Sequence, residues 1–88
     1  VLSRMGGLGS MMYFVTILIV LNLQPPLGWV QHTVPFDNRE VCLSYLNKNK
    51  SNISLSLGRQ FGNLLKGIKE YDCLTREDAV NRNTKLGH

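Results

Sequence analysis

The amino-acid sequence predicts an all-α fold, in which a small two- to three-helix domain is stapled by one disulfide and follows an N-terminal signal peptide. Three observations support this prediction. Apolar residues recur at spacings of three and four between residues 53 and 71, only two cysteines occur in the 88 residues, and an uncharged apolar run lies near the N-terminus. Because about 60 residues or fewer follow that run, we expect a small core that needs a covalent staple.

The apolar run extends from residue 11 to residue 23 and forms the centre of the predicted signal peptide. It is shorter than the roughly 20 apolar residues that a membrane-spanning helix needs, and a proline pair follows it. We expect cleavage after Gly28, so that residues 1–28 are the signal peptide and residues 29–88 the secreted, extracellular domain. The alternative is an uncleaved signal anchor that keeps the C-terminal part outside the cytosol.

Both alternatives place the C-terminal part in an oxidising compartment, where Cys42 and Cys73 are expected to form one intramolecular disulfide. Two separate thiols, or a bridge between two chains, are the other possible arrangements. No Cys-x-x-Cys or His-x-x-x-His spacing occurs in the sequence, so we expect no metal site and no cofactor.

The first helix is predicted over residues 38–47. Asp37 can accept hydrogen bonds from the backbone at the helix start, and Glu40 lies three residues further on, which is typical of a capping box. The polar residues 47–52 are expected to end this helix in an exposed loop.

The second helix is predicted over residues 53–72, because an apolar stripe runs from Ile53 to Tyr71. Its interior glycines each cost about 1 kcal/mol relative to alanine, so this helix needs a packing partner. Thr75, with Asp78 three residues later, predicts the start of a short third helix through residue 80. We expect residues 81–88 to be a loose tail.

The exposed loop between the first two helices carries two acceptor triplets for N-linked sugar. They are Asn49-Lys50-Ser51 and Asn52-Ile53-Ser54, so Asn49 and Asn52 are the predicted glycosylation sites. An unglycosylated polar turn is the alternative interpretation.

Charge and motif content argue against several functions. The net charge is +4, and acidic residues are interleaved with the basic ones, so no basic run is available for nucleic acid. Neither a phosphate-binding glycine loop nor a nucleophile or zinc-protease motif occurs, and an oxidised cysteine pair cannot supply a thiolate. We therefore do not expect an enzyme.

A small exported helical domain without an active site is typical of a ligand for a cell-surface receptor. Arg59, Lys66 and Lys69 are the candidate contact residues on the polar helix face, although such charges are also common as solvated groups. One alternative is a cationic, membrane-active host-defence peptide that uses the amphipathic helix. The others are a small single-pass membrane protein and a prohormone cut near Arg59.

Two family resemblances accompany these patterns. The leader starting at Met12-Tyr13-Phe14, and two cysteines about 30 residues apart that flank helix, resemble the exocrine-gland-secreted peptides. That resemblance implies a helical pheromone sensed by vomeronasal receptors. The segment from Leu55 to Asp78 is similar to the first helix of type I interferons and the stretch after it, which implies the N-terminal fragment of a cytokine.

Overall fold

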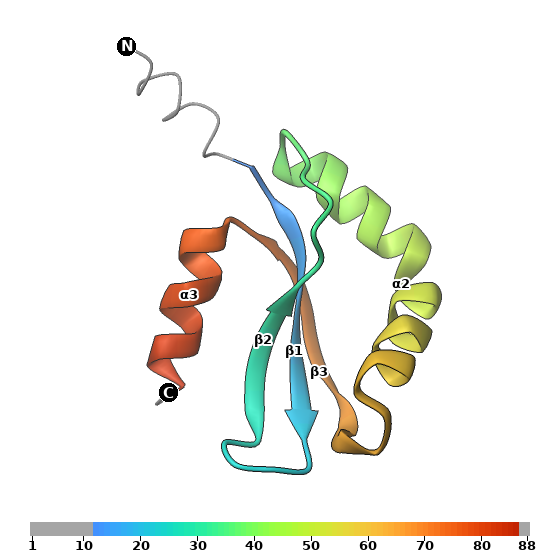
Figure 1. Cartoon of the computed structure of the whole chain (residues 1–88). Helices are drawn as coiled ribbons and strands as arrows, with labels where there is room; N and C mark the ends of the chain where they lie inside the picture. The colour runs from blue at the N-terminus through green and yellow to red at the C-terminus, as the bar shows by residue number, and fades with distance from the viewer. Residues whose placement is uncertain (1–11, 87–88) are drawn as a thin grey trace.

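The computed structural model describes residues 12–86, and over this range the chain forms two long helices and a three-stranded antiparallel sheet (Figure 1). The predicted all-α fold is therefore wrong. In chain order the elements are β1 (Phe14–Leu21), β2 (Leu27–Gln31), α2 (Arg39–Phe61), the short 3-10 helix η1 (Gly62–Leu64), β3 (Leu65–Leu74) and α3 (Arg76–Lys85).

Strand β1 is the centre of the sheet, whose strand order is β2-β1-β3. Leu18 of β1 lies opposite Trp29 of β2 on one side and opposite Glu70 of β3 on the other. The two long helices lie on opposite sides of the sheet, with α2 packed against β3 and β1 and with α3 beside β2 (Figure 1).

The apolar run that the sequence presents near its N-terminus forms β1. Six consecutive residues, Phe14 to Ile19, are buried, because alternate side chains of a strand point to opposite faces and both faces are covered here. Val15, Ile17 and Ile19 belong to the core cluster under α2. Residues 14–28 thus contribute β1 and the start of β2, whereas the predicted signal peptide over residues 1–28 stays a prediction.

Helix α2 is one continuous helix rather than a short helix and a loop. Its N-cap is Asn38, one residue later than predicted, and the Asn38 side chain accepts a hydrogen bond of 2.9 Å from the Val41 N–H. Polar residues 47–52 do not interrupt it, because the buried stripe keeps its helical phase across them. That stripe consists of Cys42, Leu46, Ile53 and Leu57.

The second predicted helix, over residues 53–72, is wrong beyond Phe61. Gly62 adopts a φ of 57°, a left-handed conformation that favours glycine, and its N–H bonds to the Gly58 carbonyl as the helix ends. The chain then turns through η1 and runs back as β3.

Strand β3 contains two irregularities that give it an unusual spacing. Tyr71, Ile68 and Leu65 lie opposite Ile17, Ile19 and Leu21 of β1, so residues three apart on β3 face residues two apart on β1. The two register shifts leave Lys69 and Lys66 as the extra residues of two β-bulges.

The predicted disulfide between Cys42 and Cys73 is confirmed, with an S–S distance of 2.07 Å and a Cα–Cα distance of 6.1 Å. Both cysteines are fully buried. The bridge joins the first turn of α2 to the C-terminal end of β3, so it fixes the helix to the sheet at one end of the core cluster.

The predicted third helix is confirmed at its start and is longer than expected. Thr75 is the N-cap of α3, and its hydroxyl accepts a hydrogen bond of 3.2 Å from the Asp78 N–H. The predicted loose tail is wrong over residues 81–85, because the side chain of Asn83 binds both backbone groups of Trp29. The Trp29 N–H donates to Asn83 Oδ1 at 2.8 Å, and Asn83 Nδ2 donates to the Trp29 carbonyl at 3.2 Å.

Candidate interaction surface on α2 and β3

The acidic side chains of β3 are held by arginines from both helices. Arg39 of α2 lies 2.7 Å from Asp72 and also donates to the Cys73 carbonyl at 3.2 Å. Arg82 of α3 approaches Asp72 at 3.5 Å and Glu70 at 4.0 Å, and its guanidinium lies 5.0 Å from the centre of the Trp29 ring. Both carboxylates are therefore paired with arginines of the same chain.

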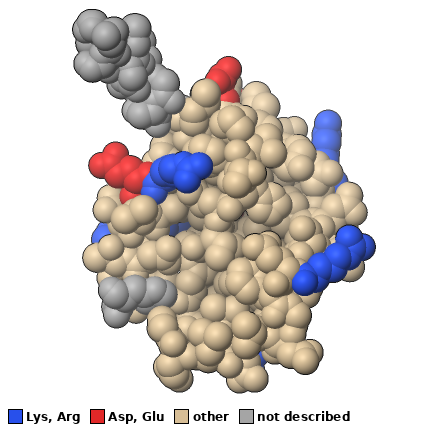
Figure 2. Space-filling view, in the orientation of Figure 1, with Lys and Arg blue, Asp and Glu red and all other residues tan. Residues whose placement is uncertain are grey.

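Several other basic residues have no such balance. Lys50 and Arg59 of α2, and Lys66 and Lys69 of β3, are exposed and form no ion pair with another residue of the 12–86 range. We call these four residues the basic surface. In the view of Figure 2, basic side chains stand out on the α2 side of the molecule, and others lie beside acidic side chains on the opposite side.

The predicted contact residues are thus exposed, but they do not share one helix face. Arg59 lies in the last turn of α2, whereas Lys66 and Lys69 are the two bulge residues of β3. A bulge leaves its extra residue outside the regular pairing, and lysine at such a position also discourages another strand from adding to the sheet edge. The bulges and the protection of the sheet edge therefore account for both lysines without a binding role.

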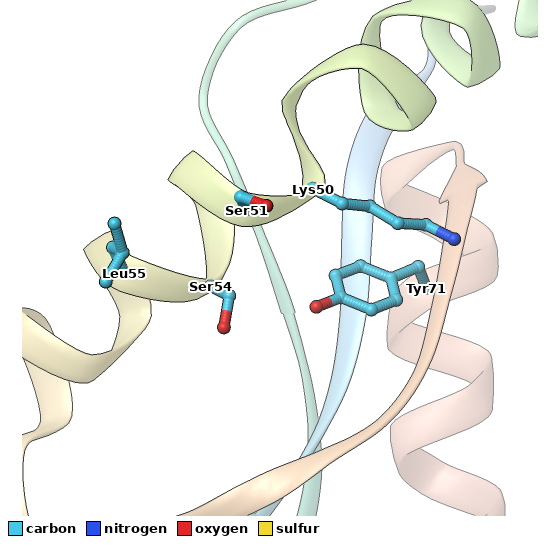
Figure 3. Close-up of a pocket in the computed structure, with 5 residues that line it drawn as sticks. All are labelled: Lys50, Ser51, Ser54, Leu55 and Tyr71. Carbon is cyan, nitrogen blue, oxygen red and sulfur yellow. The ribbon is translucent and has the colours of Figure 1, made fainter.

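An open hollow of about 470 Å³ lies between α2 and β3 (Figure 3). The Lys50 ammonium lies 5.2 Å from the centre of the Tyr71 ring, within the range of a cation–π contact. Figure 3 shows the hydroxyl groups of Ser54 and Tyr71 pointing into the same space, with Leu55 turned away from it. The lining residues are Lys50, Ser51, Ser54, Leu55 and Tyr71.

This hollow suits an anionic group. Its polar lining consists of one ammonium and three hydroxyls, all of which donate hydrogen bonds, and no carboxylate is among the lining residues. Hydrogen bonds in which one partner is charged are about twice as strong as neutral ones, and these groups can donate them to a carboxylate. Sequence patterns did not identify Lys50 and Tyr71, because their proximity depends on how α2 packs on β3.

The predicted glycosylation sites lie within α2 and not in a loop. Asn52 is exposed, whereas Asn49 is partly buried and its amide donates a hydrogen bond of 2.8 Å to the Tyr45 carbonyl one helical turn earlier. Their location in a loop is therefore wrong, and glycosylation itself stays a prediction. Ser51 and Ser54, the hydroxyl residues of the two triplets, line the hollow.

Within residues 12–86, no group of three His, Cys, Asp or Glu side chains is placed to hold a metal ion. No helix of this part of the chain is long and apolar enough to cross a membrane. No protein-family model matches the chain, and neither do any curated protein or solved structure. The pheromone and interferon resemblances therefore stay predictions.

Proposed function

We propose that this chain is a secreted, non-catalytic binding protein that acts as a ligand and presents its basic surface to an acidic region of a cell-surface receptor. The observation that carries the proposal is that the acidic residues of β3 form ion pairs within the fold, whereas several exposed basic residues form none within residues 12–86. Asp72 and Glu70 form ion pairs with arginines, whereas Lys50, Lys66 and Lys69 are exposed and have no carboxylate partner among the described residues.

The scaffold supports such a role because it holds these cations on two elements that are packed together. The disulfide and the apolar stripe of α2 fix the helix against β3, so the charges are presented in a constant arrangement. A preorganised surface loses less conformational entropy on binding, and complementary charge raises the association rate.

The packing of α2 also explains why a receptor ligand is favoured over a membrane-active peptide. Membrane-active helices insert an apolar face into the lipid interface. The apolar stripe of α2 (Cys42, Leu46, Ile53 and Leu57) is already buried against the sheet. The helix would have to leave its core, against the disulfide, before it could insert.

The first test measures saturable binding of the labelled full-length protein to intact cells before and after the cells are treated with protease. Binding that protease abolishes supports a protein receptor. Binding that survives, and that vesicles of anionic lipid reproduce, would contradict the proposal and support the membrane-active alternative.

Charge-reversal variants test whether the basic surface makes the contact. Lys69→Glu and Lys85→Glu change the net charge equally, but Lys85 lies in the last turn of α3, outside the basic surface. We expect Lys69→Glu to weaken cell binding about tenfold, since loss of a charge pair and introduction of a like charge cost about 1–2 kcal/mol together. Equal losses in the two variants would mean that only net charge matters.

A further inference from the structure

The segment that looks like a signal sequence is also the structural centre of the fold. Strand β1 is hydrogen-bonded to β2 on one side and to β3 on the other, and the sheet order leaves β2 and β3 without backbone pairing to each other. We infer that residues 14–21 remain in the working protein as its central strand. A chain from which residues 1–28 have been removed therefore cannot adopt this fold.

The packing of β1 is specific to its register. Val15, Ile17 and Ile19 are at most 1% exposed and face the buried stripe of α2. On the other face, the Arg76 guanidinium of α3 lies 4.8 Å from the centre of the Phe14 ring. A shift of one residue would exchange the two faces and separate both sets of partners.

A buried polar residue distinguishes this strand from a segment that only needs to be apolar. Thr16 is fully buried, and its hydroxyl donates to the Phe14 carbonyl at 2.8 Å. The same hydroxyl accepts a hydrogen bond of 3.0 Å from the Gln31 side chain, which also donates to the Leu74 carbonyl at 3.1 Å. Gln31 therefore ties all three strands together through Thr16, a role that has no use in a cleaved leader.

Cleavage after Gly28 would leave too little to fold in this way. It removes β1 with three members of the core cluster, Val15, Ile17 and Ile19, and it shortens β2 to Trp29–Gln31. The disulfide would then connect α2 to a single strand that has no neighbour. One strand cannot satisfy its backbone groups without a partner, so the remaining residues would not keep this fold.

This inference bears on how the chain would be exported, and it does not depend on whether the chain binds a receptor. A protein that binds a receptor could carry β1 with it, and a protein that retains β1 need not bind a receptor. An exported form would have to leave the cell without cleavage after Gly28.

The test uses the full chain with a site for a specific protease inserted into the exposed turn between β1 and β2, within residues 22–26. After cutting, we expect the β1 fragment to stay bound during gel filtration, with an unchanged circular dichroism spectrum. Once the fragments are separated in urea, the part that contains α2, β3 and α3 should show no cooperative unfolding after refolding. A C-terminal fragment that folds alone with the same urea midpoint as the uncut chain would overturn the inference.

A pair of threonine variants adds a second measurement. Thr16→Val removes the buried hydroxyl and makes the segment more apolar, which a leader would tolerate, whereas Thr33→Val alters an exposed residue after β2. We expect the urea midpoint to fall by about 1 M for Thr16→Val and to stay within about 0.3 M for Thr33→Val. A Thr16→Val protein as stable as the control would contradict the role assigned to β1.

Discussion

Removal of the disulfide is the perturbation whose effect follows most directly from this structure. Cys42 and Cys73 are separated by 31 positions, and both are fully buried. In the chain-entropy model, opening a loop of this length restores about 12 cal/mol/K to the unfolded chain, or about 3.7 kcal/mol at 25 °C. Domains of this size have a free energy of unfolding of about 4–13 kcal/mol, so the loss is a large share of the total.

The assay compares urea unfolding of the oxidised protein, the protein under reductant, and the double variant Cys42→Ala, Cys73→Ala. With an m-value of about 1–1.5 kcal/mol/M for a small domain, we expect the midpoint of the wild type to fall by about 2.5–3.7 M under reductant. The double variant should match the reduced protein to within about 1 kcal/mol, and reductant should not change it further.

A loss below about 1 kcal/mol would refute this reasoning. It would mean that the unfolded chain already holds α2 near β3 without the bridge, or that the bridge strains the folded state. If the reduced protein is unfolded even without urea, the free energy of unfolding of the oxidised form sets the lower limit of the loss.

Three further predictions concern single residues. Leu57→Ala removes a side chain that is 2% exposed, and it should cost about 2–5 kcal/mol in urea unfolding. Asn83→Ala frees the backbone groups of Trp29 on the edge strand, so it should lower the free energy of unfolding by about 1–3 kcal/mol. It should also increase self-association in analytical ultracentrifugation, because the exposed edge can pair with another chain. A variant that stays monomeric would show that Asn83 does not protect this edge. Asn38→Ala should cost about 1 kcal/mol, whereas Asp37→Ala should cost almost nothing; the reverse order, measured by thermal unfolding, would place the cap at Asp37.

The features that the sequence predicted correctly are local or follow from counting. Two cysteines in one chain allow a single intramolecular pairing, and Cys42–Cys73 is that pairing. The Thr75 cap depends only on a hydroxyl and a backbone N–H three residues apart. The Thr75 cap is complete within a few residues, and the cysteine pairing needs only the cysteine count, so neither depends on which segments become strands.

The candidate site was only partly predictable. Arg59, Lys66 and Lys69 were correctly expected to be exposed, because charged residues away from a partner remain solvated. Their placement on one helix face was wrong, and the hollow beside Lys50 and Tyr71 could not be found from sequence spacing.

By itself, the sequence determined the disulfide, the cap of α3 and the apolar character of each segment, whereas the tertiary structure decided which of these segments are strands. In β3, bulges at Lys66 and Lys69 convert the two-residue period of a strand into the three-residue spacing of Leu65, Ile68 and Tyr71, which imitates a helix. In β1, burial on both faces removes the alternation and leaves an apolar run that imitates a leader. In both segments the apolar pattern depends on tertiary packing, namely the burial of both faces of β1 and the pairing of β3 with β1. Residue order along the chain does not specify this packing.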